Sequence, residues 1–232
     1  MIRAHLATFP ARRAILADTI RSIAPQVDRL FLCLNDYDAI PAWLDGFANL
    51  HPMIPESDLK DTGKFAFDPQ DDDLVFTIDD DILYPPDYVE RTLRQAEAFD
   101  LSRSIVGYQA NRWTFKKAQG RHGWKTFMFF KPCRRAERVD VLGTGTACMT
   151  GRAMPRLGDL AGAAGFVDIR FATWQMDRGR EFWVLPRGAD DLRRNLPEDL
   201  KATSLFHTVA TSGRADLRAE TRALLDRIGS RG

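Results

Sequence analysis

The chain has 232 residues, 44% of them hydrophobic, and a formal net charge of +1. This length allows a domain with a substantial core, and the nearly neutral charge excludes a global field that would recruit nucleic acid or a membrane. Three widely spaced cysteines with no C-x-x-C pair indicate a reducing, cytoplasmic setting without disulfides or a zinc site. Because no apolar run of about 18 residues occurs, we expect no transmembrane segment, and peripheral membrane contact is left open.

The N-terminal third alternates strands with a helix. Residues 2–7 are predicted to form a strand, and apolar residues at positions 15, 16, 19, 20 and 23 have the spacing of one helical face. Residues 29–35 and 73–78 are apolar on both faces, which is typical of parallel strands covered by helices. A polar loop is predicted between these two strands.

The same alternation continues downstream. Pro85 and Pro86 turn the chain, and Asp87 with Glu90 forms an Asp variant of the capping box, which predicts a helix over residues 88–99. Further strands are predicted over residues 104–109, 138–143, 146–150 and 181–186, and helices over residues 168–178 and 216–228, the last docking on the core or on a partner. The pattern predicts an α/β fold with a mainly parallel central sheet flanked by helices.

Three consecutive carboxylates, Asp79, Asp80 and Asp81, directly follow the strand predicted at 73–78. Like charges repel and raise one another's pKa, so the triplet requires a cation or a hydrogen-bond network. Ligands of open α/β sheets bind at the carboxyl ends of strands, and Asp79 and Asp81 share a face at roughly 6.5 Å Cα separation. Carboxylates suit Mg²⁺ or Mn²⁺ with a substrate phosphate. The alternative is a solvated acidic turn, which we expect for the earlier triplet at residues 71–73.

Two further segments suggest binding. Residues 143–146, GTGT, can present backbone N–H groups and hydroxyls to a sugar or phosphate, or they mark a bulge in a strand. Residues 112–138 contain nine Lys or Arg, one acid and six Trp or Phe. Such a segment can bind single-stranded nucleic acid, cover a sugar donor, or form a solvated hairpin. The absence of basic character elsewhere favours the cover.

The segment TIDDDILYPPDYV resembles the DxD region of nucleotide-sugar glycosyltransferases with the GT-A fold, of the family-two-like kind. ATFPARRAILADTIRSIAPQVDRLFLCLNDYD, VLGTGTACMTGRAM and GFVDIRFATWQMDRG resemble other parts of these enzymes, in the same order over roughly residues 1–190. The resemblance implies a single GT-A domain, with a nucleotide-binding half at 1–110 and, at 111–232, an acceptor-side half with a smaller antiparallel element and a C-terminal helix. It further implies inverting transfer from a nucleotide diphosphate sugar to a saccharide or lipid-linked saccharide, in bacterial surface polysaccharide or glycoconjugate synthesis.

The resemblance also implies roles for single residues. Mn²⁺ or Mg²⁺ would be held by Asp79, Asp81 and His207, and Asp168 would be the catalytic base. The donor would contact Thr8, Pro10, Arg12, Asn35, Asp36, Lys64, Asp79, Asp80, Gly143, Thr144, Gly145 and Thr146. Plain structural alternatives exist: a solvated helix turn for Arg12, a surface turn for Lys64, a packed side chain for His207 and a helix cap for Asp168.

Three other functions share parts of this pattern. A sugar nucleotidyltransferase has the same α/β plan but a G-x-G-T-R-type phosphate loop after the first strand, where this chain has ATFPARR. A haloacid-dehalogenase-type phosphatase has Thr or Val four residues after the first Asp, where this chain has Leu83. A non-catalytic sugar-binding or RNA-binding module is the alternative from another class, although we do not expect nucleic acid as a partner.

Overall fold

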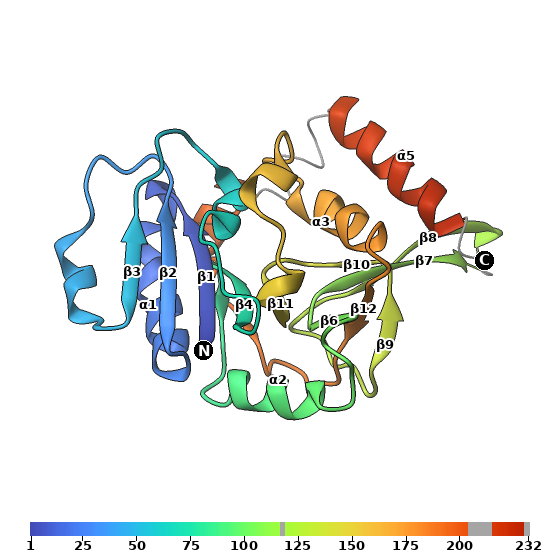
Figure 1. Ribbon diagram of the computed structural model, residues 1–232, viewed down its shortest axis with the longest axis horizontal. Coiled ribbons are helices and arrows are strands. Elements are labelled where there is room, and N and C mark those ends of the chain that lie inside the picture. Colours follow the sequence, from blue (N-terminus) through green and yellow to red (C-terminus); the bar gives the residue numbers. More distant parts are fainter. Residues whose placement is uncertain (117–118, 204–214, 230–232) are drawn as a thin grey trace.

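The structure is a computed structural model that describes residues 1–116, 119–203 and 215–229 (Figure 1). Its centre is an eight-stranded sheet with the strand order β3-β2-β1-β4-β11-β6-β12-β9. These strands are β1 (Ile2–Thr8), β2 (Arg29–Leu34), β3 (Leu50–Met53), β4 (Leu74–Asp79), β6 (Ser104–Gly107), β9 (Glu137–Val139), β11 (Thr146–Thr150) and β12 (Glu181–Val184). The smaller sheets contain β7 (Ala110–Lys116), β8 (Arg121–Phe127) and β10 (Val141–Leu142) in one, and β5 (Ile82–Leu83) and β13 (Arg193–Arg194) in the other.

The large sheet is mostly parallel, as predicted. Strands β3, β2, β1 and β4 run parallel to one another, and β12 runs parallel to β6. Strand β11 runs antiparallel between β4 and β6. The carboxyl ends of β1 and β4 therefore meet at one edge of the sheet, and β11 begins at that same edge.

Helices cover both faces of this sheet. α1 (Arg13–Ile23) and α2 (Tyr88–Ala96) share a core cluster with one face of the sheet, whose members include Leu16 of α1 and Phe76 of β4. α3 (Val167–Met176) and α5 (Ala215–Gly229) contribute to a second cluster, whose members include Phe171, Leu224 and Val75 of β4. Val75 and Phe76 belong to opposite clusters because successive side chains of a strand point to opposite faces. Within the described ranges, every helix is too short or too polar to span a bilayer.

The predicted docking of the C-terminal helix on the core is confirmed. Leu224 of α5 is fully buried, and Arg227 of α5 pairs with Asp177 at 2.8 Å, just beyond the end of α3. Arg170 of α3 also pairs with Glu220 of α5. The apolar face indicated by the sequence thus packs inside the molecule.

Three sequence-based boundaries are wrong, for identifiable reasons. The strand predicted at 138–143 is divided between two sheets, because Asp140 separates β9 from β10 and its carboxylate accepts a hydrogen bond from Trp113 N at 2.7 Å. Helix α2 ends at Ala96, and Asp87 makes no side-chain cap; its carboxylate lies 3.9 Å from Arg91 Nη2 instead. β3 falls in the predicted loop, and its Pro52 is tolerated because β3 lies at the sheet edge.

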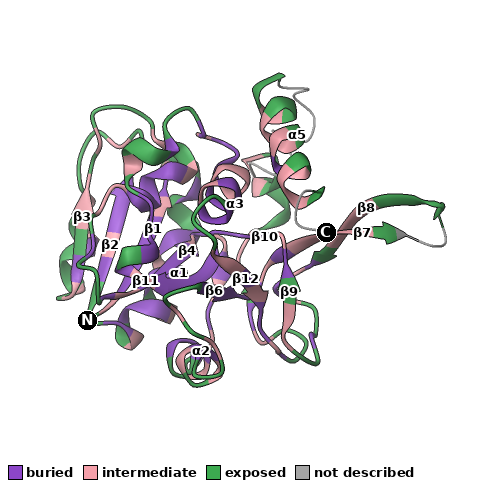
Figure 2. Cartoon of the chain, turned by 45° about the vertical axis from the view of Figure 1, so that its right-hand side comes forward, coloured by how far each residue is buried: buried purple, intermediate pink, exposed green. Residues whose placement is uncertain are grey.

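The basic and aromatic segment forms the β7–β8 hairpin, which extends away from the body of the molecule (Figure 2). Trp113 lies opposite Trp124, and Phe115 lies opposite His122, so one face of the hairpin is aromatic. On the other face, Arg112 and Lys125 both form ion pairs with Glu137. This part of the segment therefore forms a hairpin, which both the cover and the solvated hairpin require, and its role as a cover stays a prediction.

Candidate functional site

The site is built where the ends of three central strands meet. β1 ends at Thr8 and β4 ends at Asp79, and their parallel register brings Ala7 beside Asp79. Thr146, the first residue of β11, lies opposite Ile78 of β4. The GTGT segment just before β11 therefore reaches the carboxyl edge where the acidic triplet lies, which is the usual ligand-binding position in such sheets.

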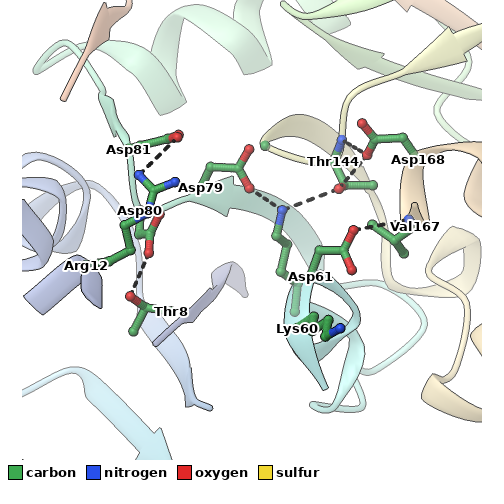
Figure 3. A network of polar contacts seen from close by, with 12 residues as sticks. Thr8, Arg12, Lys60, Asp61, Asp79, Asp80, Asp81, Thr144, Val167 and Asp168 are labelled. Carbon is green, nitrogen blue, oxygen red and sulfur yellow. Dashed lines mark hydrogen bonds and ion pairs between the residues drawn. The ribbon is translucent and has the colours of Figure 1, made fainter. Parts of the chain in front are cut away.

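Each carboxylate of the triplet has a different partner (Figure 3). Asp79 forms an ion pair with Lys64. Asp80 is buried and accepts a hydrogen bond from Thr8 Oγ1 at 2.6 Å. Asp81 lies 3.4 Å from Nη1 of Arg12, a buried guanidinium. Arg12 and Lys64 are thus ion-pair partners inside the site rather than solvated surface cations.

These partners do not fully compensate the negative charge. Burial and repulsion from Asp81 raise the pKa of Asp80 to about 7, against the lowering effects of Arg12 and Thr8. Burial and repulsion from Asp79 also raise the pKa of Asp81. Raised carboxylate pKa values mean that additional positive charge at this edge would be stabilising.

Lys64 connects the triplet to the opposite side of the site. Its ammonium contacts Asp79 and lies 3.3 Å from Thr144 Oγ1. Burial alone would lower the pKa of Lys64, but the charges of Asp79, Asp168 and Asp61 together raise it, so the side chain is cationic. Thr144 in turn donates to Asp168 Oδ1 from its backbone N at 2.8 Å and from its hydroxyl at 2.7 Å. A continuous chain of contacts therefore runs from Asp79 to Asp168.

Asp168 lies in the first turn of α3 without capping it. Within the described residues, Asp168 accepts hydrogen bonds from Thr144 N and Thr144 Oγ1, both on Oδ1, and no side chain caps the start of α3. Burial raises the pKa of Asp168, and Lys64 and Thr144 oppose this shift. The helix-cap interpretation of Asp168 is therefore wrong, and among the described residues Oδ2 has no hydrogen-bond donor.

The start of α3 is held instead by Asp61, which sequence reasoning missed. Its carboxylate accepts hydrogen bonds from Gly165 N at 2.6 Å and Val167 N at 3.2 Å. The signal was the residue before the helix: Phe166 has no side-chain oxygen with which to satisfy the free N–H groups of a helix start. Asp61 and Lys64 share the 3-10 turn Lys60–Phe65, so this turn fixes both Lys64 and α3.

The GTGT segment contributes unequally. A Cβ at Gly145 would overlap the Asp79 carboxylate, so a larger residue here would displace that side chain. Thr146 is buried, and its hydroxyl accepts hydrogen bonds from Tyr108 N at 3.1 Å and Gln109 N at 2.9 Å. Gly143 N donates to the carbonyl oxygen of Gln109. Thr144 thus carries the polar contacts of this segment to the site, while Thr146 is committed to the fold.

Other predicted donor residues lie around this centre. Asn35 is buried and holds the adjoining turn, accepting from Leu59 N and donating to Lys60 O, each at 3.0 Å. Asp36 and Pro10 are exposed, and Asp36 has a left-handed φ of 55°. Asn35 therefore shapes the site, and Asp36 and Pro10 are free to contact a ligand.

Tyr84 was not singled out by sequence reasoning, although it belongs to the segment that carries the triplet. Its hydroxyl accepts from Asp79 N at 2.9 Å and donates to Gly145 O at 2.7 Å. Tyr84 therefore links the triplet to the GTGT segment through two hydrogen bonds. Its chain position beside two prolines indicated a turn and gave no sign of this contact.

The triplet provides ligands that suit a divalent cation. Asp79 and Asp81 offer carboxylate oxygens, the ligands that Mg²⁺ and Mn²⁺ prefer, and a cation would relieve the repulsion between them. Within the described part of the chain, no three His, Cys, Asp or Glu side chains form a metal-binding group. The residues fit an ion that takes its remaining ligands from water and a diphosphate. His207, the expected third ligand, lies outside the described residues.

No protein-family model matches the chain, and no curated protein matches it. Among solved structures, the crystal structure of GalNAc-T7 with UDP, GalNAc and Mn²⁺ matches 80% of this chain with a TM-score of 0.53 and 8% identity. The fold resembles that of GT-A proteins. The match covers 42% of that protein, so this chain spans less than half of its length.

A second solved structure, that of 4-diphosphocytidyl-2C-methyl-D-erythritol synthase, aligns with 90% of this chain and 99% of its own, with a TM-score of 0.48 and 11% identity. At such low identity neither likeness shows an activity. The activity must be argued from the chemistry of the site.

Proposed function

We propose that this chain is a glycosyltransferase that moves a sugar from a nucleotide diphosphate donor to a hydroxyl group of a saccharide or lipid-linked saccharide, with inversion at the anomeric carbon. The observation that carries the proposal is the chain of contacts from Asp79 through Lys64 and Thr144 to Asp168. These contacts support the proposal because they join the acidic triplet to a separate carboxylate, Asp168. Sugar transfer needs both: positive charge for the leaving diphosphate and a base for the acceptor.

The diphosphate side is formed by the triplet and its two cations. Arg12 is buried and held by Asp81, so it provides positive charge that requires little reorganisation when a diphosphate binds. Lys64 is a second buried cation, paired with Asp79. Bound at Asp79 and Asp81, Mn²⁺ or Mg²⁺ would supply Lewis-acid stabilisation of the leaving group. In this proposal residues 1–110 bind the nucleotide and residues 111–232 form the acceptor side.

The acceptor side depends on Asp168. Thr144 fixes Oδ1, and Oδ2 is assigned to take the proton from the acceptor hydroxyl as that oxygen attacks the anomeric carbon. The raised pKa of Asp168, caused by burial, makes it a stronger base than an ordinary carboxylate. Asp61 acts as a positioning residue because it holds the start of α3.

The test begins with donor identification, by thermal shift with UDP and GDP, with and without Mn²⁺. A ligand at 100 times its dissociation constant stabilises a protein by roughly 2.7 kcal/mol. Transfer from the matching nucleotide sugars is then compared in the wild type and Asp168→Asn. Asn retains an oxygen that can accept from Thr144 but cannot take a proton, so turnover should fall about 10² to 10⁴-fold while melting temperature and nucleotide affinity stay unchanged.

The control is Asp159→Asn, which changes an exposed carboxylate on the segment before α3. It should transfer like the wild type. Wild-type turnover by Asp168→Asn, or a product that retains the donor's anomeric configuration, would remove Asp168 from the base role. Formation of a nucleotide sugar from a nucleoside triphosphate and a sugar phosphate would instead identify a nucleotidyltransferase.

A further inference from the structure

In the Lys64–Asp79 ion pair, the lysine side chain is buried and the aspartate side chain is partly exposed. The Lys64 side chain is 4% exposed, whereas that of Asp79 is 38% exposed. Lys64 also lies 3.3 Å from Thr144 Oγ1, so its ammonium is held between two elements. The carboxylate is thus accessible to an incoming ion while one of its oxygens is already bound to a cation of the protein.

The neighbouring carboxylate is arranged in the same way. Asp81 is 25% exposed at its side chain, and Arg12, its partner at 3.4 Å, is 4% exposed. Each of the two carboxylates proposed as metal ligands is therefore paired with a buried cation. A divalent ion that reached Asp79 would meet the ammonium of Lys64 at close range, and like charges repel most strongly where water is scarce.

The geometry points to a competition at Asp79: we propose that Lys64 acts as a resident counter-cation that keeps divalent metal off Asp79 until a nucleoside diphosphate binds. This inference rests on the proposed function. A diphosphate offers the ammonium new anionic partners, and lysine can follow them because its donors lie on a flexible four-carbon stem. Asp79 is then released for the metal, which the same diphosphate also ligates.

This arrangement makes metal and diphosphate binding cooperative. Metal alone must displace Lys64 without offering it a new partner, and diphosphate alone lacks the divalent charge. When both are present, metal raises the affinity for diphosphate and diphosphate raises the affinity for metal. By linkage the two factors are equal. The protein would thereby avoid holding metal in the absence of a donor.

The test measures Mn²⁺ binding by the electron paramagnetic resonance signal of free Mn²⁺, with and without UDP or GDP. For the wild type we expect weak binding of Mn²⁺ alone and at least a tenfold gain with the diphosphate that binds. Lys64→Met should bind Mn²⁺ alone at least tenfold more tightly than the wild type, and its gain with diphosphate should fall towards one. The matched control, Lys60→Met, removes an exposed lysine from the same turn and should behave like the wild type.

Circular dichroism establishes whether each variant folds. If Lys64→Met does not fold, it is replaced by Lys64→Gln, which keeps a hydrogen-bond donor for Asp79 without the positive charge. Equal affinity of the wild type and the Lys64 variants for Mn²⁺ alone overturns the proposal, as does an equal affinity of the wild type for Mn²⁺ with and without a diphosphate that binds. If neither diphosphate binds the wild type, the proposed function fails. Tighter Mn²⁺ binding by Lys64→Met alone would still support the competition at Asp79.

Discussion

Strand β4 has three consecutive aspartates at each end, and the two triplets have opposite environments. At the amino end, Asp71 and Asp72 are exposed, while Asp73 is buried. Asp73 pairs with Arg3 at 3.1 Å and accepts from Gln70 N at 2.9 Å. Burial alone would raise the pKa of Asp73, but these hydrogen bonds and the Arg3 charge lower it. The expected solvated turn is therefore correct for two residues and wrong for Asp73.

At the carboxyl end the balance is reversed. The pKa values of Asp80 and Asp81 are raised by burial and by repulsion within the triplet, although Thr8 and Arg12 oppose the shift. A lowered pKa means that the fold stabilises the ionised form, and a raised one means that the fold leaves charge uncompensated. In the first triplet the charge of the buried Asp73 is thus compensated by the fold, whereas the second triplet retains negative charge that a ligand can neutralise.

The largest stability effect is expected at the first triplet. Asp73→Asn leaves the buried Arg3 without its anionic partner, and breaking a buried pair in this way costs about 3 to 5 kcal/mol. Urea denaturation measures this loss. Asp72→Asn, at an exposed position, should change the free energy of unfolding by less than about 0.5 kcal/mol. A loss at Asp73 no larger than that at Asp72 would contradict the structural role.

Gly151 and Gly145 allow the two triplets to be compared, because Gly151 lies against Gln70, next to the first triplet, and Gly145 lies against Asp79 of the second. A Cβ at Gly151 would overlap the backbone carbonyl oxygen of Gln70, which cannot move freely. Gly151→Ala should therefore cost about 1 to 3 kcal/mol of stability, as overpacking does.

Gly145→Ala should behave differently, because its Cβ would overlap the Asp79 side chain, whose carboxylate can rotate away. We expect a smaller loss of stability than for Gly151→Ala but a loss of Mn²⁺-dependent binding of UDP or GDP, measured by calorimetry. Intact ligand binding by Gly145→Ala would show that the position of Asp79 is not important for the ligand.

A smaller, pH-dependent effect is expected from His5, which pairs in register with Thr77 between the two triplets. Burial, with the charge of Arg3, lowers the pKa of His5 from 6.5 to about 3. Between these values the unfolded chain binds a proton that the folded chain does not, so stability falls as pH falls, by up to about 1.4 kcal/mol per pH unit.

The raised pKa of Asp80 has the opposite effect on stability over much of the same pH range. The pH dependence of wild-type stability therefore does not separate the two residues. The difference between the wild type and His5→Phe isolates the histidine. Phe keeps a ring against Phe31, whose centroid lies 5.1 Å from that of His5. Urea denaturation at pH 7, 6 and 5 should show this difference shrinking or reversing in favour of the variant as pH falls. A difference that is independent of pH would contradict the buried neutral imidazole.

The sequence predicts much of this arrangement because it depends on local pattern. The apolar runs of β2 and β4 place the second triplet at a strand end in a parallel sheet, and Arg12, Lys64, Thr144 and Asp168 are all identified as candidates. The remaining features depend on contacts between distant segments. The hydrogen bond of Asp61 to Gly165 joins residues 104 positions apart, and the burial of Asp73 depends on Arg3, 70 positions away. No local spacing reports such contacts.

The central claim is that the second triplet binds a metal and a nucleoside diphosphate together. The most direct measurement is calorimetric titration of UDP and GDP, each with and without Mn²⁺, into the wild type, Asp81→Asn and the control Asp72→Asn. We expect Mn²⁺-dependent binding by the wild type and by Asp72→Asn. Asp81→Asn should keep its melting temperature and lose at least about tenfold in that affinity, or about 1.4 kcal/mol. If Asp81→Asn binds UDP or GDP with Mn²⁺ as tightly as the wild type, the second triplet does not bind the metal and the diphosphate as proposed.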